Sequence, residues 1–268
     1  MNSSNIFTRL VLQTFNFFSS WKDQCLCTVC GSIGKFQRHL PNLRESMICP
    51  YCQSISRKRH VAKIILDTFS PYNHSLNDAD KELSKLKIYD LSCNGAIHNT
   101  LKELPSYYCS EYYDDVTPGT MNPEGIRCED LTKLSFTDGF FDLVISEDVL
   151  EHVDDYEKAF RELNRVLKPG GYHIFTVPLY GDRKTRKKAL MEDGKIVQLL
   201  PPEYHGDPIR GEILVFNEFG TDLCDILGKV GFQSEIIIAD KKDEKKLGIY
   251  MSIVLRSRKI LRESEANA

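Results

Sequence analysis

Apolar and polar residues alternate with two different periods along the middle of the chain. The apolar run at residues 141–146 predicts a buried strand, and apolar residues at positions 156, 159, 160, 163, 166 and 167 follow the spacing of an amphipathic helix. The run Lys168-Pro169-Gly170-Gly171 ends the helical pattern, and residues 172–177 predict a second buried strand. This strand–helix–strand unit is typical of an open parallel sheet, which binds ligands beyond the carboxyl ends of its strands.

Similar patterns extend the unit in both directions. Further strands are predicted at residues 87–91, 107–112, 126–128, 232–239 and 247–255, and further helices at 97–104 and 216–230. The charged residues 240–246 predict the tip of a hairpin. The alternation of strands and helices indicates the α/β class.

The patterns divide the chain into five segments. They are an amino-terminal segment with a helical pattern (1–24), a cysteine-rich module (25–60), a connecting helix and linker (61–85), the α/β domain (86–258) and a tail (259–268). We expect the first segment to pack on the fold. The alternative is an interfacial membrane anchor whose apolar face would hold Phe7, Val11, Phe15 and Phe18.

Composition sets mild bounds on the function. The 268 residues are 41% hydrophobic and 27% charged, which suffices for one α/β domain with a small appendage. The 35 basic and 38 acidic residues, with a pI near 6.2, create no overall field that would attract nucleic acid or an anionic membrane. No apolar run reaches the roughly 20 residues that span a bilayer, and residues 6–18 lack the features of a signal peptide. We therefore expect a soluble, cytoplasmic protein without a transmembrane span.

Four of the nine cysteines follow the spacing of a zinc site. Cys27 and Cys30 form one Cys-x2-Cys pair, and Cys49 and Cys52 form another after 18 residues. Four thiolates leave no open position on a tetrahedral Zn²⁺ ion, so the expected role is structural. Disulfides are the poorer explanation in a reducing compartment. We interpret Cys25 as a bystander or at most a substitute ligand, and the others as small core residues: Cys93, Cys109, Cys128 and Cys224.

The cysteine module is locally basic. Residues 35–60 hold one acid, Glu45, and six basic residues, which are Lys35, Arg38, Arg44, Arg57, Lys58 and Arg59. A polyanion could bind there. The interpretation that we favour is that these side chains cap loops and pair with acids of the main domain.

Three sequence blocks and the cysteine pairs resemble motifs of a known family. Residues 141–153 (FDLVISEDVLEHV), 161–171 (RELNRVLKPGG) and 174–178 (IFTVP) look like blocks of class I S-adenosylmethionine-dependent methyltransferases. The cysteine pairs, with residues 201–208 and 219–222, are similar to a zinc-knuckle-bearing subset of that family, some members of which occur among glycan-modifying enzymes. The resemblance implies a Rossmann-like open sheet of seven strands, in the order 3-2-1-4-5-7-6 with strand 7 antiparallel.

The resemblance also implies where S-adenosylmethionine would bind. The turn after the first strand, with Asp90, Ser92, Asn94 and Gly95, stands in the place of the family's glycine-rich turn. Serine, asparagine and alanine occupy positions 92, 94 and 96, where glycines are usual, and this departure puts cofactor binding in doubt. The other expected cofactor contacts are Glu111 for the ribose, Asp130 and the backbone of Leu131 for the adenine, and Ser146 after the fourth strand.

One histidine is the candidate catalytic residue. His205 lies in a loop bounded by proline and glycine, with Glu203 and Asp207 nearby, and could act as a general base. We expect His152 to be structural, with a weaker alternative next to the cofactor. The leading hypothesis is O-methylation of a small-molecule or glycan-type acceptor. The alternatives are an RNA methyltransferase that binds substrate through the zinc module, and a non-catalytic binding protein on a decayed scaffold; the oligomeric state stays open.

Overall fold

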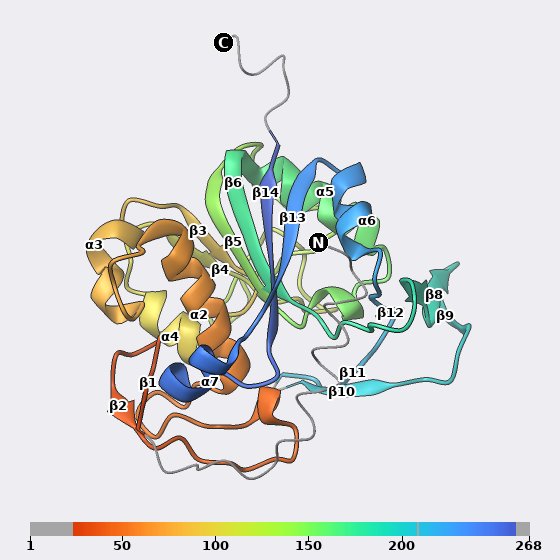
Figure 1. Ribbon diagram of the computed structural model, residues 1–268. Helices are drawn as coiled ribbons and strands as arrows, with labels where there is room; N and C mark the ends of the chain where they lie inside the picture. The colour runs from red at the N-terminus through yellow and green to blue at the C-terminus, as the bar shows by residue number, and fades with distance from the viewer. Residues whose placement is uncertain (1–23, 208, 261–268) are drawn as a thin grey trace.

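The structure is a computed structural model that describes residues 24–207 and 209–260 (Figure 1). The predicted helix of segment 1–24, with its apolar face, lies outside the described residues except for Gln24, and so do residues 261–268 of the predicted tail. Within the described ranges, no helix is long and apolar enough to cross a membrane.

A six-stranded sheet forms the centre of the fold. Its strands run in the order β13 (Phe232–Ile238), β14 (Ile253–Lys259), β6 (Leu167–Thr176), β5 (Phe141–Glu147), β3 (Ile88–Asp90) and β4 (Tyr107–Cys109). Strands β4, β3, β5 and β6 are parallel to one another, and β14 is antiparallel to both of its neighbours. The fold is therefore Rossmann-like, and its strands have the order 2-1-4-5-7-6 in the predicted numbering.

The predicted third strand does not form, so the seven-strand order is not confirmed. Residues 126–128 contribute one isolated parallel bridge, between Cys128 and Glu111. The physical reason is local pairing: Asn122 donates its backbone N–H to Ile126, and Cys128 donates to Thr120. The segment thus folds back on itself instead of extending the sheet.

Helices cover both faces of the sheet (Figure 1). Helices α2 (Ser56–Phe69), α3 (Asp80–Leu83) and α4 (Gly95–Leu101) lie on one side, and α5 (Tyr156–Val166) and α6 (Leu223–Lys229) lie on the other. Side chains alternate accordingly, since Leu143 and Ile145 pack with α2 while Val144 packs with α5. Two separate hydrophobic cores result, one on each face.

Three predicted elements near the carboxyl end differ from the structure. Residues 241–247 form helix α7 (Lys241–Leu247) instead of a hairpin tip, because Asp240 accepts hydrogen bonds from the N–H groups of Lys242 and Asp243 and Gly248 ends the helix at a φ of 61°. The last strand consequently begins at Ile253. The helix predicted at 216–230 is only α6, because its first residues pair as β12 (Asn217–Glu218) with β7 (Arg186–Lys187).

An insertion of short strands lies between β6 and α6. Besides the β7–β12 pair it contains two hairpins, β8 (Ala189–Glu192) with β9 (Lys195–Gln198), and β10 (Tyr204–Asp207) with β11 (Gly211–Leu214). The sequence patterns did not predict these strands. They matter for function because β10 carries His205.

The cysteine module packs directly on the α2 side of the domain. It contains β1 (Cys25–Leu26), β2 (Ile33–Gly34) and a short 3-10 helix (Leu43–Glu45). Its buried side chains, among them Val29, Phe36 and Met47, belong to the same hydrophobic core as α2. The predicted linker also packs, because Leu76, Ala79 and Leu83 are buried, around a 3-10 helix (Asn77–Ala79) and α3.

The four predicted metal ligands lie together. Cys27 Sγ is 3.6 Å from Cys52 Sγ, Cys30 Sγ is 3.9 Å from Cys49 Sγ, and all four sulfur atoms lie within 4.8 Å of one another. Zn–S bonds of about 2.3 Å in a tetrahedron place sulfurs about 3.8 Å apart. In each pair the residue after the second cysteine has a positive φ, 79° at Gly31 and 61° at Gln53. The arrangement is compatible with a closed tetrahedral zinc site.

Arg59 ties this module to the carboxyl-terminal part of the chain. Its side chain is fully buried, and its guanidinium stacks 4.1 Å from the centre of the Phe36 ring. It donates hydrogen bonds to four backbone carbonyl oxygens, those of Met47, Ser54, Leu247 and Gly248. One buried cation therefore satisfies carbonyls of two segments that are far apart in sequence.

We expect Arg59→Met to be strongly destabilising. The substitution keeps an apolar stem but leaves the four carbonyl oxygens without a donor, so the free energy of unfolding should fall by about 2–5 kcal/mol. Urea denaturation followed by circular dichroism measures this change. Arg161→Met, at an exposed position of α5, is the control and should stay within about 0.5 kcal/mol of the wild type. Equal stability of the two variants would contradict the role assigned to Arg59.

We also expect Cys49→Ser to lower the zinc content of the purified protein by about one equivalent per chain, because a site that loses one of four thiolates binds the ion far more weakly. Elemental analysis after dialysis measures the difference from the wild type. Cys224→Ser, which changes a half-buried cysteine of α6, is the matched control. Zinc content that is the same in both variants would rule the site out.

Candidate functional site

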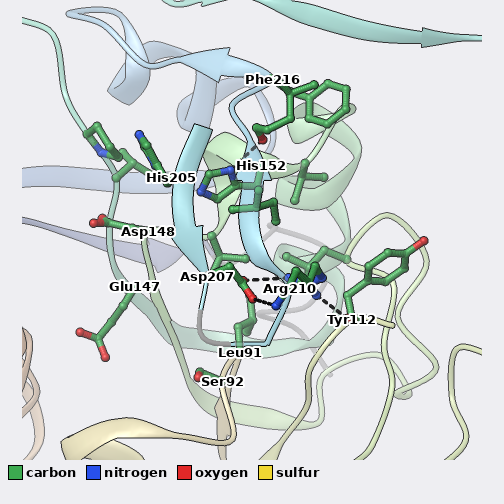
Figure 2. Close-up of a pocket in the computed structure, with 18 of the residues that line it drawn as sticks. Leu91, Ser92, Tyr112, Glu147, Asp148, His152, His205, Asp207, Arg210 and Phe216 are labelled. Atoms are coloured by element: carbon green, nitrogen blue, oxygen red, sulfur yellow. Dashed lines mark hydrogen bonds and ion pairs between the residues drawn. The ribbon is translucent and has the colours of Figure 1, made fainter. Parts of the chain in front are cut away.

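A cleft of about 1640 Å³ opens at the carboxyl edge of the parallel strands. One end is bounded by the turn after β3 and the end of β4, and the other by the segment after β5 and the β10–β11 hairpin. Figure 2 shows this hairpin crossing the cleft, with His205 on one side and Asp207 and Arg210 on the other. Arg210 donates a hydrogen bond to the carbonyl of Tyr112, which follows β4, so the hairpin bridges the cleft's two ends.

The turn after β3 is organised by one carboxylate. Glu111 Oε1 accepts hydrogen bonds from Ser92 Oγ (3.1 Å), the Cys93 backbone N–H (2.8 Å) and Asn94 Nδ2 (3.3 Å). Within residues 90–96, only Gly95 has a positive φ, at 89°. The residues that replace the family's glycines at 92, 94 and 96 therefore adopt backbone conformations that any residue tolerates. The departures in sequence do not strain the turn.

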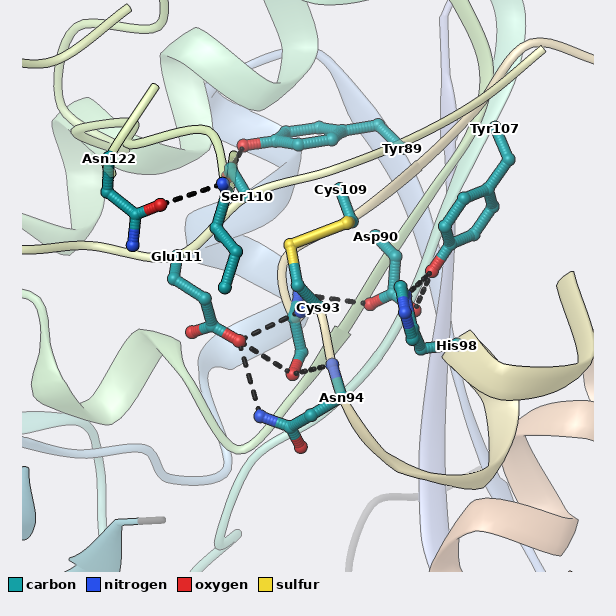
Figure 3. The surroundings of a disulfide bond; sticks show 12 residues. Tyr89, Asp90, Cys93, Asn94, His98, Tyr107, Cys109, Ser110, Glu111 and Asn122 are labelled. Atoms are coloured by element: carbon teal, nitrogen blue, oxygen red, sulfur yellow. Dashed lines mark hydrogen bonds between the residues drawn. A yellow bond between two sulfur atoms is a disulfide. The ribbon is translucent and has the colours of Figure 1, made fainter. Parts of the chain in front are cut away.

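A disulfide further fixes this turn (Figure 3). Cys93 in the turn is bonded to Cys109 at the end of β4, and their Cα atoms are 5.3 Å apart. The prediction that these two cysteines are small core residues is wrong, because both are only half-buried and the parallel pairing of β3 with β4 brings the ends of the two strands together. Cys128 is buried in the core as predicted, and Cys224 is half-buried.

Asp90 lies below the turn and does not line the cleft. Burial, and to a smaller degree the charge of Glu147, raise the pKa of Asp90 to about 8. Its oxygens accept hydrogen bonds from the Ser92 backbone N–H (3.2 Å) and the Tyr107 hydroxyl (2.9 Å). The geometry thus gives Asp90 the role of a support for the turn.

The other predicted cofactor residues divide into two groups. Ser92, Asn94, Glu111, Asp130 and Leu131 all line the cleft. Burial raises the pKa of Glu111, while Asp130 accepts a hydrogen bond from the Thr132 backbone N–H at 2.7 Å. Gly95 lies next to this group in the turn. Ser146 does not line the cleft: it is buried, and its hydroxyl lies 2.9 Å from Nε2 of His173 in β6.

Two acids that follow Ser146 are paired with cations of the amino-terminal part. Arg44 makes a bidentate pair with Asp148, at 2.6 and 2.7 Å, and Arg57 contacts both Glu147 and Asp148. Lys58 Nζ lies 2.8 Å from Glu147. Burial alone would raise the pKa of Asp148, but the charges of Arg57 and Arg44 hold this pKa well below its usual range. The interpretation that the module's cations pair with the main domain is confirmed.

This pairing removes the surface on which RNA binding was expected to depend. Arg57 and Arg59 are buried, and Lys58 is engaged by Glu147. The second basic run, at residues 183–188, is also used internally, because Glu218 pairs with Arg183, Arg186 and Lys188. Most of the charges of these two runs are therefore engaged within the protein.

A carboxylate and two imidazoles meet at the other end of the cleft. Glu151 Oε1 lies 3.8 Å from His152 Nε2 and 3.8 Å from His205 Nδ1, and the two rings are 5.0 Å apart at nearly a right angle. His205 Nε2 also lies 3.5 Å from Glu203 Oε1. Burial, with the nearby charge of Asp148, raises the pKa of Glu151 well above its usual range. The sequence pattern singled out His205 but missed Glu151.

Comparisons with known proteins show similarity to methyltransferases over part of the chain. A family model described as a methyltransferase domain matches residues 91–175. The chain is similar to the sarcosine/dimethylglycine N-methyltransferase of Halorhodospira halochloris, with 49% identity over 47 residues that are 18% of this chain and 17% of that protein. It is also similar to the norajmaline N-methyltransferase of Rauvolfia serpentina, with 35% identity over 96 residues, or 29% of this chain and 33% of that one. The chain thus spans a third or less of the length of these two relatives.

The structure has counterparts among solved structures. An S-adenosylmethionine-dependent methyltransferase from Mesorhizobium loti is 20% identical over 65% of this chain and 91% of that chain, with a TM-score of 0.39. Residues 91–175 therefore match a methyltransferase domain, and the sheet with the cleft at its carboxyl edge has the class I methyltransferase fold.

Proposed function

We propose that the protein transfers a methyl group from S-adenosylmethionine to a small acceptor bound in the cleft. The observation that carries this proposal is the convergence of Glu111, Asp130 and the turn at 92–95 at one end of a cleft whose other end holds His205. The cofactor would supply an activated methyl group on a sulfonium. The protein's own task would be to align the acceptor in line with that group and to exclude water, since orientation alone removes much of the barrier to a displacement.

Each cofactor contact has a candidate group. The carboxylate of Glu111 would accept hydrogen bonds from the ribose hydroxyls, and Asp130 with the Leu131 backbone would bind the adenine. The backbone N–H groups of the turn would approach the rest of the cofactor. The undistorted turn argues against the alternative of a decayed, non-catalytic scaffold, because its side chains replace glycines without positive φ angles.

The charge of the cleft bears on the acceptor. Twelve acidic and five basic residues line it, and three of the five, Arg44, Arg57 and Lys58, are already paired with Glu147 or Asp148. A negative lining attracts cations and repels polyanions. It favours the cationic cofactor and an amine acceptor over RNA or a phosphorylated compound.

We favour a small amine as the acceptor class. Two of the curated relatives that the chain matches in part are named N-methyltransferases, and the charge of the cleft agrees with that chemistry. The predicted O-methylation of a small-molecule or glycan-type acceptor is the second candidate. It draws support from His205, which lines the cleft where a hydroxyl would have to lose its proton.

We expect Glu111→Gln to weaken S-adenosylmethionine binding by about 10–100-fold, because hydrogen bonds to a charged acceptor contribute about 1.5–3 kcal/mol. The glutamine carbonyl can still accept from Ser92, Cys93 and Asn94, so the turn should persist. Isothermal titration calorimetry with the cofactor measures the change. Glu103→Gln, at an exposed position after α4, is the control, and equal affinities for the two variants would refute the assignment of Glu111.

Methyl transfer itself is tested with a labelled cofactor. We expect the purified protein to label compounds of a panel of small amines faster than those of a matched panel of alcohols or total RNA, and Glu111→Gln to slow the labelling. Scintillation counting of the separated panels gives the rates. Label mainly in the alcohols would establish the second candidate, and label mainly in RNA would revive the RNA alternative. Cofactor binding without any label would favour the non-catalytic alternative.

A further inference from the structure

Glu151 is a buried acid whose carboxylate accepts no hydrogen bond within the described part of the chain. Its side chain is 1% exposed, and neither Oε1 nor Oε2 has a donor within hydrogen-bonding distance. Burying a carboxyl group without a hydrogen-bond partner costs roughly several kcal/mol in either protonation state. Such a group calls for a partner that the protein chain does not provide.

The surroundings of Glu151 are preorganised around it. Phe216 donates its backbone N–H to the Glu151 carbonyl at 2.8 Å, and His152 Nδ1 lies 2.8 Å from the Leu214 carbonyl. Because a carbonyl only accepts, His152 must carry its proton on Nδ1, and Nε2 then presents a lone pair toward Glu151. Residues 214–216 of the insertion thus fix the backbone of Glu151 and the tautomer of the His152 imidazole.

His205 completes the arrangement from the β10–β11 hairpin. Its Nε2 faces Glu203 at 3.5 Å, and its Nδ1 faces Glu151 at 3.8 Å. A carboxylate behind one nitrogen of a histidine is the usual support for a metal bound at the other nitrogen. Two lone pairs and one carboxylate oxygen therefore converge from three directions.

The spacing matches a metal site better than hydrogen bonds. Distances of 3.8 Å from Glu151 Oε1 to both imidazole nitrogens are too long for hydrogen bonds. Ligands on a tetrahedral ion with bonds of about 2.1 Å stand about 3.4 Å apart. All three ligand atoms lie within 4.8 Å of one another, so small side-chain adjustments would bring them onto one ion.

We propose that Glu151, His152 and His205 bind a divalent transition-metal ion. Two imidazoles and one carboxylate suit Zn²⁺, Fe²⁺, Co²⁺ or Mn²⁺ and leave coordination positions open. Asp148 is not a further ligand, because Arg44 and Thr176 occupy its oxygens. The site is separate from the four-cysteine cluster, which has no open position.

The place of the ion gives it a function. His152 and His205 line the same cleft as Glu111 and Asp130, at the opposite end. An ion there would bind an oxygen atom of the acceptor and so hold the acceptor facing the methyl donor. An attacking nitrogen would stay off the ion, because its single lone pair forms the new bond to the methyl group while the sulfonium leaves as a neutral thioether. This role rests on the proposed methyl transfer, whereas metal binding itself does not. It uses Nδ1 of His205 as a ligand, so this nitrogen cannot also be the free base.

Cobalt titration of the protein that carries one equivalent of zinc per chain, in the four-cysteine site, tests the proposal. We expect the wild type to bind one further Co²⁺ ion, with visible d–d bands but without the near-ultraviolet thiolate band that a cysteine site gives. Glu151→Gln and His205→Ala should each weaken this binding at least tenfold, or about 1.4 kcal/mol. His39→Ala removes an exposed histidine of the cysteine module and should leave it unchanged. Competition by Zn²⁺ should bleach the bands.

Two results would overturn the proposal. One is the absence of any Co²⁺ binding beyond the cysteine site in the wild type, and the other is unchanged binding in Glu151→Gln. Circular dichroism and retained zinc confirm that each variant is folded. S-adenosylmethionine titration of the same samples separates the two proposals: cofactor binding without the second metal overturns only the metal site, and metal binding without cofactor overturns only the methyl transfer.

Discussion

The charge pairing at the end of β5 holds the functional parts together. Glu147 and Asp148 leave the sheet at the centre of its carboxyl edge, and Asp148 has a φ of 54°, which turns the chain sharply. Three cations from the amino-terminal part, Arg44, Arg57 and Lys58, neutralise the two acids. Because buried charges require partners, this turn forms only when the cysteine module is folded against the sheet. The cysteine cluster thus acts on the cleft through these ion pairs without lining it.

The same segment connects the two ends of the cleft. Glu151 and His152 follow the turn at Asp148 within four residues. Hydrogen bonds hold both in place, from Phe216 to the Glu151 carbonyl and from His152 to the Leu214 carbonyl. The β10–β11 hairpin then returns to the β4 side through Arg210 and Tyr112. A change in the hairpin would therefore move His205 relative to the turn that Glu111 organises, so the two ends are mechanically coupled.

The sequence predicts those parts of the fold that depend on local periodicity. Residues 141–146 were predictable because they form a short, nearly continuous apolar run, and the helix at 156–166 because its buried positions repeat with the helical period. Helix α7 was not, because its residues are polar all round and its stability comes from the Asp240 cap and Gly248. The short strands of the insertion were missed because they are only two to four residues long, which is too short for a period to be recognised.

The residues of the candidate site also fall into those that the sequence predicts and those that it does not. The resemblance led to Glu111, Asp130 and the turn, which line the cleft or lie next to its lining because each stands at or near the end of a predicted strand. The link between Cys93 and Cys109 depends instead on which strands become neighbours. Ser146 was misplaced because the parity of a strand's last residues decides which face a side chain takes, and Ser146 faces His173. Glu151 resembles a solvated acid in the sequence. Only the structure, in which Glu151 lies close to both His152 and His205, indicates a role for it.

The two clusters differ in a way that assigns them different tasks. Four soft thiolates close a tetrahedron and exclude any other ligand, so an ion there can only stabilise the module. Glu151, His152 and His205 supply three harder ligands at the wall of a cleft, which leaves room for an acceptor atom. A positive ion at this wall would also offset part of the excess of acids that line the cleft. The negative lining would then stabilise a cationic methyl donor and a metal ion that bind close to each other and to a neutral nucleophile.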